Sequence, residues 1–227
     1  VAADGTQIKN AGAAGGTYTS RRLMSMGIAP ITLSDGPAGV RMGYKATTWT
    51  SPTAIASSWD DQLMNDIAVQ TGKEAAFYGV DVMLAPGQNI LRNPQSGRNF
   101  EYFSEDPLLA GNIAREYTEG VQTQNVGVTE KHFAGNEQET YRSGGNTIAS
   151  ERSLREIYLK PFQISGEAKP WSVMCSYNRL NSIYACSNEW LLTNVLRGDF
   201  GFNGFVMSDW GAAQNVFDVV KAQNDLV

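Results

Sequence analysis

The chain has 227 residues, of which 42% are hydrophobic and 18% charged, and it carries a formal net charge of −5. This composition is typical of a soluble globular protein that is long enough to bury one large core. Mild acidity without a run of Lys or Arg argues against nucleic acid or an anionic membrane as a partner. No apolar stretch reaches the roughly 18 residues of a membrane-spanning helix, and the N-terminus lacks the charged-then-apolar order of a signal peptide. The chain starts with Val1 rather than Met, so we expect a processed or otherwise incomplete polypeptide.

Five apolar runs rich in β-branched residues predict strands, and the amphipathic segments between them predict helices. The expected strands cover residues 29–35, 80–87, 125–135, 171–178 and 204–209. Each run is continuously apolar rather than alternating, which is typical of strands covered on both faces. Such regular alternation of strand and helix indicates parallel strands joined by helical crossovers.

Two of the expected helices follow the first two strands. Ser58 and Asp61 form a candidate capping box for the first of them. Asp106 and Pro107 begin the next one, as an N-cap and a first-turn proline do. Its apolar residues repeat every four positions, at Leu109, Ile113, Tyr117 and Val121.

The two later helices carry their own boundary signals. A helix over 150–162 is expected to turn Leu154, Ile157 and Tyr158 inward and to kink or end at Pro161. The last helix is expected to begin at Asn188 as its cap and to end at a glycine.

These elements predict an α/β fold, either a parallel sheet or a β/α-barrel, and a (β/α)8 barrel of the TIM type would be incomplete in this chain. About five βα units are visible, whereas eight need about 250 residues. No linker or repeat divides the sequence, so residues 1–227 are expected to form a single domain. Because an incomplete barrel exposes strand edges, we expect a second fragment, chain or copy to cover them.

Polar and aromatic residues gather directly after each expected strand, where a parallel sheet or barrel builds its active site. Their types suit a polyol: carboxylates, Arg, Lys and His bind hydroxyl groups, while Tyr and Trp stack on a sugar ring. No P-loop or dinucleotide-binding glycine pattern is present. An aspartate whose pKa is kept low by cationic neighbours would stay ionised, as a glycosidase nucleophile must. His132 is the only histidine, so no histidine-rich metal site is expected.

The segments "LSDGPAGVR", "GRNFEYFSEDP", "KHFAGNEQE", "SERSLREIYLKPF", "VMCSYNRLN" and "GFVMSDWGA" resemble, in this order, glycoside hydrolase family 3. The resemblance implies a β/α-barrel of the TIM type, which is partly collapsed in some family members. It further implies that Asp209 is the nucleophile, which forms a covalent glycosyl-enzyme intermediate. It also implies that the substrate-binding residues are Asp35, Arg98, Lys131, His132, Arg142, Tyr177, Met207 and Trp210, with an unusual backbone geometry between Lys131 and His132. Glu101 and Glu105 are expected to be either supporting carboxylates of the site or helix-start carboxylates, and neither is expected to take part in the chemistry.

Retaining hydrolysis needs a second carboxyl group about 5–5.5 Å from the nucleophile. The N-acetylglucosaminidase branch of the family uses a His in a "KHFPGHG" loop, whereas this chain has "KHFAGNE". In the glucosidase and xylosidase branches the acid/base is a glutamate of an α/β-sandwich domain, which this chain lacks. The expected function is therefore a retaining exo-β-glycosidase, a β-glucosidase acting on a β-glucoside or a short β-glucan, whose acid/base comes from the rest of the enzyme.

Three alternatives stay open at the level of sequence. The chain could be a non-catalytic carbohydrate-binding protein, or its specificity could be of the β-xylosidase type. Lys131 could also act as the Schiff-base lysine of an aldolase or isomerase. No cofactor or metal is implied.

Cys175 and Cys186 are close enough in sequence to close a small disulfide loop, and the alternative is a pair of buried free thiols. If they pair, an extracellular or periplasmic location is favoured. The cysteine pattern also resembles that of secreted family members.

Overall fold

The computed structural model describes residues 15–16, 24–27, 29–41 and 45–227. Its main sheet has the strand order β1 (Gly15–Gly16), β2 (Thr32–Asp35), β3 (Val82–Leu84), β4 (Gly127–Phe133), β6 (Ser172–Cys175) and β9 (Phe205–Ser208). Within this sheet, β2, β3, β4, β6 and β9 run parallel to one another, and β1 pairs with β2 in the antiparallel direction. All five predicted strands are thus confirmed, in sequence order, although each is shorter than its apolar run.

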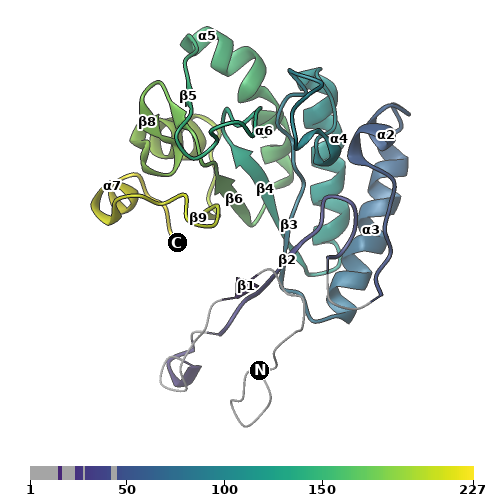
Figure 1. The fold of residues 1–227 in the computed structure, drawn as a ribbon. Helices are drawn as coiled ribbons and strands as arrows, with labels where there is room; N and C mark the ends of the chain where they lie inside the picture. Colours follow the sequence, from purple (N-terminus) through teal and green to yellow (C-terminus); the bar gives the residue numbers. More distant parts are fainter. Residues whose placement is uncertain (1–14, 17–23, 28, 42–44) are drawn as a thin grey trace.

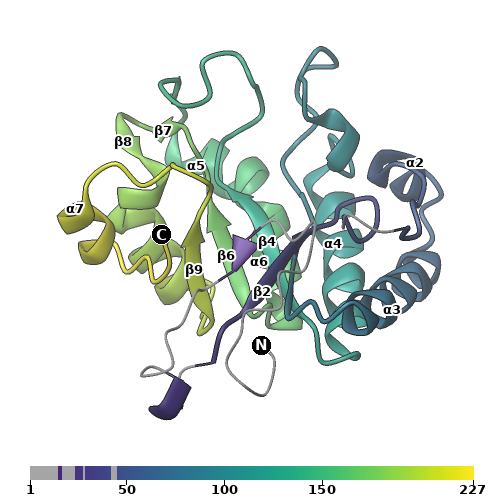
Figure 2. The same ribbon diagram turned by 60° about the horizontal axis from the view of Figure 1, so that its bottom comes forward.

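The parallel strands form a curled half-barrel with helices packed along its outer side (Figures 1 and 2). Two long helices, α3 (Asp61–Phe77) and α4 (Pro107–Gln122), lie side by side next to β3 and β4. The shorter α6 (Lys160–Ser165) and the π-helix η5 (Trp190–Asp199) cover the part of the sheet that follows. The expected incomplete barrel is therefore confirmed, and the assignment of residues 1–227 to one domain stays a prediction.

Both faces of the sheet are apolar because strand side chains alternate between them. On β3, Met83 packs toward α3 and α4, while Val82 and Leu84 face the concave side. On β6 and β9, Met174 and Met207 join this concave cluster, whereas the residues beside them pack under the helices. The continuous apolar runs in the sequence therefore reflect burial on two sides.

The helix starts follow capping chemistry, with one correction. Helix α3 is capped by Asp60, whose Oδ1 accepts from the Leu63 amide at 3.0 Å. The predicted capping box at Ser58 is wrong, because the Ser58 hydroxyl donates backward to the Ile55 carbonyl at 2.6 Å. Helix α4 begins as expected, with Asp106 Oδ1 accepting from the backbone amides of its first turn and with Pro107 as its first residue.

The helix expected over 150–162 is divided into three parts: α5 (Glu151–Ser153), the π-helical η2 (Leu154–Tyr158) and α6. Pro161 lies in the first turn of α6, where its missing N–H costs no hydrogen bond. Leu154 is fully buried, but Ile157 is 38% exposed, so its predicted inward position is wrong. The wider π turn rotates this side chain away from the core.

The predicted ends of the last helix are close to those observed for η5. Asn188 Oδ1 accepts from the Leu191 amide at 3.1 Å, and Gly201 follows the helix with a left-handed φ of +69°. A side chain would be strained in that conformation, which is why the chain turns at a glycine.

Several short elements surround the carboxyl ends of the strands. Between β2 and α4 lie α2 (Pro52–Ala56) and the 3₁₀ turn η1 (Asn99–Glu101). A second sheet has the order β5 (Asn146–Thr147), β7 (Arg179–Leu180) and β8 (Ile183–Tyr184). The remaining elements are the 3₁₀ turns η3 (Gly166–Ala168) and η4 (Ala185–Ser187) and the helix α7 (Val216–Lys221).

A disulfide joins Cys175 at the end of β6 to Cys186 in η4, with 5.1 Å between their Cα atoms. It closes the loop that carries β7 and β8 against the main sheet. Of the two readings that the sequence left open, the structure contains the paired cysteines. Within the described ranges, no helix has the length and apolar character needed to cross a membrane.

Candidate active site

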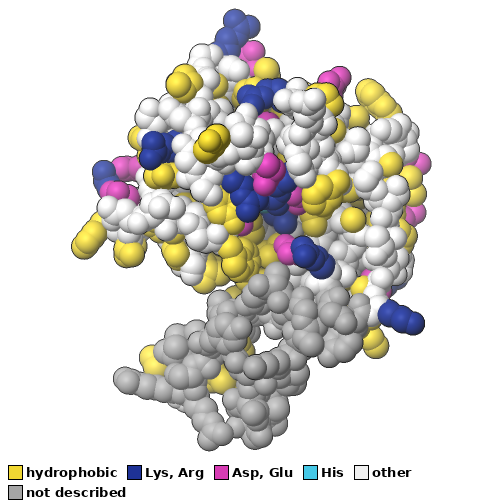
Figure 3. Space-filling view, in the orientation of Figure 1, with side chains coloured by type: hydrophobic (Ala, Val, Ile, Leu, Met, Phe, Trp, Pro, Cys, Tyr) yellow, Lys and Arg dark blue, Asp and Glu magenta, His cyan; other side chains and the backbone are white. Residues whose placement is uncertain are grey.

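The carboxyl ends of β2, β4, β6 and β9 surround a polar cavity of about 340 Å³. Charged side chains of both signs gather in the hollow at the centre of the face shown in Figure 3. The cavity is lined by Asp35, Arg98, Lys131, His132, Arg142, Met174, Tyr177, Asp209 and Trp210. Eight of the nine site residues predicted from the sequence are therefore brought together, although they are spread over 176 positions of the chain.

Asp209 directly follows β9 and is 8% exposed. Its Oδ1 accepts from the Trp210 amide at 2.8 Å. Its Oδ2 has no hydrogen-bond partner among the described residues and lies 3.6 Å from His132 Nε2 and 3.9 Å from Arg98 Nη1. One carboxylate oxygen is thus fixed to the backbone, while the other is available to a ligand.

Burial raises the pKa of Asp209 above its ordinary value, and this effect exceeds the opposing influence of the Trp210 amide and the Arg98 charge. The low pKa expected from the sequence is therefore wrong in direction. The cationic neighbours are present as expected, but removing the carboxylate from water outweighs them.

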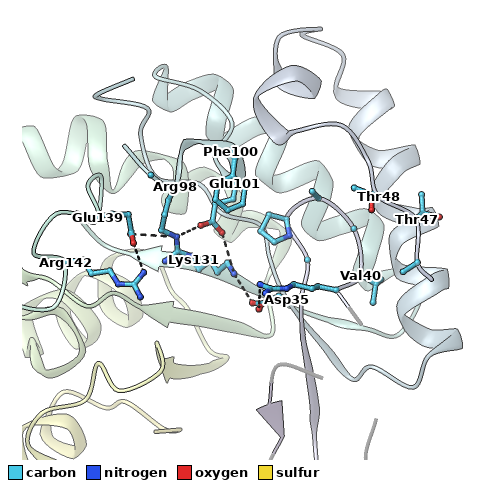
Figure 4. Close-up of a pocket in the computed structure, with 17 residues that line it drawn as sticks. Asp35, Val40, Thr47, Thr48, Arg98, Phe100, Glu101, Lys131, Glu139 and Arg142 are labelled. Atoms are coloured by element: carbon cyan, nitrogen blue, oxygen red, sulfur yellow. Dashed lines mark hydrogen bonds and ion pairs between the residues drawn. The ribbon is translucent and has the colours of Figure 1, made fainter. Parts of the chain in front are cut away.

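A chain of alternating charges crosses the floor of the site (Figure 4). Arg98 Nε donates to Glu101, and Glu101 Oε2 lies 3.9 Å from Lys131 Nζ. Lys131 Nζ in turn lies 3.5 Å from Asp35 Oδ1, and Arg41 Nη1 lies 3.5 Å from Asp35 Oδ2. Each buried cation is therefore compensated by a carboxylate, which is the condition for holding such charges out of water.

Arg98 stays protonated in this setting. Burial alone would lower the pKa of Arg98, but the hydrogen bond to Glu101 and the negative charges of Glu101 and Asp209 raise it overall. The guanidinium is therefore a permanent positive charge beside the free oxygen of Asp209.

Backbone hydrogen bonds hold Lys131 and His132 in place. The resemblance implied an unusual backbone geometry for this pair, and the peptide bond between the two residues is cis. The Gln88 amide donates to the Lys131 carbonyl at 2.8 Å, and Asn89 Nδ2 donates to the His132 carbonyl at 3.0 Å. Asn89 Oδ1 also accepts from the His132 amide at 2.8 Å. Both side chains reach the cavity from this one clamped segment.

The opposite wall combines an arginine with an aromatic ring. The Arg142 guanidinium lies 4.5 Å from the centroid of the Tyr177 ring and is held by Glu139 Oε2 at 2.7 Å. The Tyr177 hydroxyl donates to the Trp210 carbonyl at 2.8 Å. Burial, together with the Asp209 charge, raises the pKa of Tyr177 to about 12, so the hydroxyl keeps its proton.

The prediction for Met207 needs a correction. Met207 is 2% exposed and packs in the concave apolar cluster, and it does not line the cavity. Met174, its register partner on β6, lines the cavity instead. Trp210 lines the cavity and is 49% exposed, which leaves much of its indole ring uncovered.

Two residues that orient the site, Glu139 and Asn89, were not selected from the sequence for that purpose. Glu139 pairs with Arg142 and lies 4.0 Å from Arg98 Nε, and Asn89 clamps the backbone of His132. Both are polar residues that lie shortly after an expected strand. This position in the sequence does not distinguish residues that support the site from residues that line its cavity. The sequence did mark Glu101 as a supporting carboxylate, and its contacts with Arg98 and Lys131 fit that position.

A larger hollow of about 600 Å³ adjoins the cavity and shares Asp35, Arg98, Lys131 and Arg142 with it. Figure 4 shows this hollow between the η1 region and the loop that follows Asp35. In the part of the chain that the structure describes, no group of three His, Cys, Asp or Glu side chains is placed to hold a metal ion. Chemically, the site offers one carboxylate with an oxygen that lacks a hydrogen-bond partner among the described residues, several fixed hydrogen-bond donors suited to hydroxyl groups, and an aromatic edge.

The sequence profile of the Glycosyl hydrolase family 3 N terminal domain matches residues 13–227 of the chain. Among curated proteins, the chain is 41% identical over 222 residues to thermostable beta-glucosidase B of Acetivibrio thermocellus. The aligned region covers 92% of this chain and 29% of that protein. It is 43% identical over 212 residues to an exo-alpha-(1->6)-L-arabinopyranosidase of Bifidobacterium longum, covering 87% of this chain and 28% of that protein.

Among solved structures, the fold matches that of beta-glucosidase 3B from Thermotoga neapolitana in complex with glucose. The TM-score is 0.93 at 48% sequence identity, over 97% of this chain and 32% of the other. The chain therefore spans less than a third of the length of these relatives.

Proposed function

Because this chain belongs to glycosyl hydrolase family 3 through its N-terminal domain, we propose that it forms the nucleophile half of a retaining exo-β-glucosidase. The observation that carries the proposal is the carboxylate of Asp209. One of its oxygens is anchored to a backbone amide, and the other is buried in the cavity without a hydrogen-bond partner among the described residues. A nucleophile needs this combination of fixed orientation and one free lone pair.

In the proposed reaction, Asp209 Oδ2 attacks the anomeric carbon of a terminal glucosyl residue and the glycosidic bond breaks. The resulting glycosyl ester is then hydrolysed by water. In this proposal, five side chains that line the cavity hold the sugar hydroxyls. They are those of Asp35, Arg98, Lys131, His132 and Arg142. Their mutual ion pairs fix them before the sugar arrives, which favours stabilisation of charge that develops in the transition state.

The raised pKa of Asp209 fits this reaction in one further respect. A carboxylate that is partly removed from water loses less hydration when a sugar covers it, and the positive charge that develops on the oxocarbenium-like transition state stabilises its ionised form. The consequence is a requirement for a pH at which Asp209 is ionised.

We propose that the acid/base carboxyl group comes from polypeptide outside these 227 residues. Glu101 and Glu139 are both occupied by arginines of the site. The relatives extend far beyond the part that this chain matches. The proposed partner is thus the remainder of such an enzyme, and the proposed substrate is a β-glucoside or a short β-glucan.

The test is Asp209→Asn, which keeps the shape of the side chain and removes its nucleophilic charge. With an aryl β-glucoside whose leaving group needs no acid, kcat should fall by several orders of magnitude while glucose still binds. Asp218→Asn, at an exposed position of α7, is the matched control and should leave kcat unchanged. Activity of Asp209→Asn within a few-fold of the unaltered protein would refute the assignment.

A pentopyranosidase is the second candidate, because one relative is named as an arabinopyranosidase. A pentopyranose lacks the hydroxymethyl group of glucose, so the aryl β-glucoside, β-xyloside and α-L-arabinopyranoside can be compared directly by kcat/KM. The proposal requires the glucoside to give the largest value. If a pentopyranoside gives the largest value, the substrate assignment is wrong and the nucleophile assignment is unaffected.

We also propose an oxidising location, extracellular or periplasmic, on the basis of the Cys175–Cys186 disulfide. Fractionation of the native host, with detection by an antibody, tests this proposal. Recovery of the protein in the cytosol with both thiols free would contradict it.

A further inference from the structure

Tyr102 makes a contact with His132 that lies outside the cavity. Its hydroxyl oxygen is 3.1 Å from His132 Nδ1, and the two rings meet edge to face with 6.1 Å between their centroids. Tyr102 is fully buried and lines neither the cavity nor the adjoining hollow. It therefore contacts the site only from behind, through the histidine.

The direction of this hydrogen bond follows from what each group can do. A tyrosine hydroxyl can donate or accept, but a neutral imidazole has one nitrogen that donates and one that accepts. Within the described part of the chain, His132 Nδ1 is the hydrogen-bond partner of the Tyr102 hydroxyl. If Nδ1 carried the proton, the buried hydroxyl would have to accept, and its own proton would be left without an acceptor.

The protonation states of the two residues support the same direction. Burial raises the pKa of Tyr102 well above its ordinary value, so its hydroxyl keeps its proton. Burial and the cations Arg98, Lys131 and Arg142 lower the pKa of His132 well below its ordinary value, so the ring is neutral and carries a single proton. Tyr102 then determines which of the two ring nitrogens, Nδ1 or Nε2, carries that proton.

The other ring nitrogen faces the reactive carboxylate. His132 Nε2 lies 3.6 Å from Asp209 Oδ2, the oxygen that lacks a hydrogen-bond partner. With the proton on Nε2, the ring presents a donor to this oxygen and to the cavity. With the proton on Nδ1, a lone pair would face the carboxylate and repel it. Asn89 holds the His132 backbone at both its amide and its carbonyl, so the placement of this backbone does not depend on Tyr102.

We propose that Tyr102 is a positioning residue that fixes His132 as its Nε2–H tautomer, so that the imidazole donates toward Asp209 and the bound sugar. The catalytic consequence rests on the proposed function, but the tautomer itself does not. Tyr102 is expected to act only through His132, because it has no contact with the cavity.

The tautomer can be measured directly because His132 is the only histidine in the 227 residues. The chain is purified without a histidine tag after labelling with ¹⁵N-histidine, and long-range ¹H–¹⁵N correlation spectra are recorded at neutral pH. The proposal predicts a single neutral imidazole whose proton is on Nε2. A proton on Nδ1 in the unaltered chain would overturn the proposal without any variant.

Tyr102→Phe removes the donor and retains the ring. The variant should show His132 in the Nδ1–H form or in both forms, and kcat/KM for the activated aryl β-glucoside should fall about tenfold to a hundredfold, mainly in kcat. The matched control is Tyr117→Phe, a buried tyrosine of α4 whose hydroxyl donates to the Gly36 carbonyl at 3.3 Å. The control should keep the tautomer and the rate of the unaltered chain.

The outcomes separate this proposal from the proposed function. An unchanged tautomer in a folded Tyr102→Phe variant would refute the positioning role, whatever the rate. The expected tautomer in the unaltered chain, without any glycosidase activity even after the remainder of the enzyme is supplied, would support the hydrogen bond and refute the proposed function. If Tyr102→Phe does not fold, the spectrum of the unaltered chain decides alone.

Discussion

Glu130 provides a prediction about stability that depends on a single buried carboxyl group. It precedes Lys131 on β4 and faces the helices, where it accepts from Gln88 Nε2 at 3.0 Å, Ser165 Oγ at 2.8 Å and Thr118 Oγ1 at 3.3 Å. Despite these donors, burial raises the pKa of Glu130 from 4.5 to about 7. The folded chain therefore holds a proton that the unfolded chain releases at lower pH.

The expected magnitude follows from this difference in pKa. Below about pH 4.5 the group is protonated in both states and contributes no pH dependence. As the pH rises from 4.5 to about 7, the unfolded chain loses the proton first, so the free energy of unfolding falls. Each pH unit is worth about 1.4 kcal/mol, which gives a loss of about 3 kcal/mol that is complete above pH 7.

The perturbation is Glu130→Gln, and the assay is urea unfolding at pH 4.5 and pH 8. Any loss of stability caused by fitting the amide of the variant into the site of the carboxyl group is the same at both pH values. It therefore cancels when the stability difference between the variant and the unaltered chain at pH 4.5 is compared with that at pH 8. The variant should gain about 3 kcal/mol relative to the unaltered chain between pH 4.5 and pH 8. Glu137, whose pKa burial also raises to about 7, is present in both chains and cancels as well.

Glu119→Gln, at an exposed position of α4, reports the effect of losing one negative charge from the surface. If the stability difference between Glu130→Gln and the unaltered chain is the same at pH 4.5 and pH 8, Glu130 does not hold a proton at neutral pH in the folded state. The reasoning from burial would then be refuted.

Three further predictions concern the site, the core and the disulfide. Arg98→Ala removes a charge that lowers the pKa of Asp209, so the acid limb of the kcat/KM profile should move to higher pH and sugar binding should weaken; a limb at the same pH would contradict this. Gly111→Ala places a methyl group 2.8 Å from Ile164 Cβ where α4 meets α6, and thermal unfolding should show a loss of about 1–3 kcal/mol. Gly198→Ala, whose added methyl group would lie 3.5 Å from the Thr193 carbonyl oxygen, should show no such loss. Cys186→Ala opens the disulfide loop and should lower the free energy of unfolding in urea by about 3 kcal/mol; stability equal to that of the unaltered chain would contradict the structural role of the bond.

The order of the strands and the gathering of the site could be predicted because they depend on patterns that are long or repeated. Five apolar runs of similar length predict a parallel sheet, and the ends of parallel strands meet at one edge. Asp35, Lys131 and Asp209 were found in this way, and all three line the cavity. The same rule could not choose between Met174 and Met207, because the two are register partners on adjacent strands and both belong to the concave apolar cluster.

Local features that depend on geometry were harder to predict. Ser58 and Asp60 are both acceptable caps by residue type, and only the path of the chain makes Asp60 the cap of α3. The π turn of η2 moves Ile157 outward, although its spacing matches that of buried neighbours. The pKa of Asp209 depends on a balance between burial and nearby cations, and the sequence shows the cations without showing the burial.

The central claim is that Asp209 is the nucleophile of a retaining glycosidase, and a covalent trap tests it most directly. The protein is incubated with a 2-deoxy-2-fluoro-β-glucoside whose leaving group departs without protonation by an acid. The adduct is then located by peptide mass spectrometry. The account predicts one fluoroglucosyl ester, on Asp209, and none in Asp209→Asn. An ester on another carboxylate would contradict the account, as would the absence of any adduct both with the chain alone and after the remainder of the enzyme is supplied.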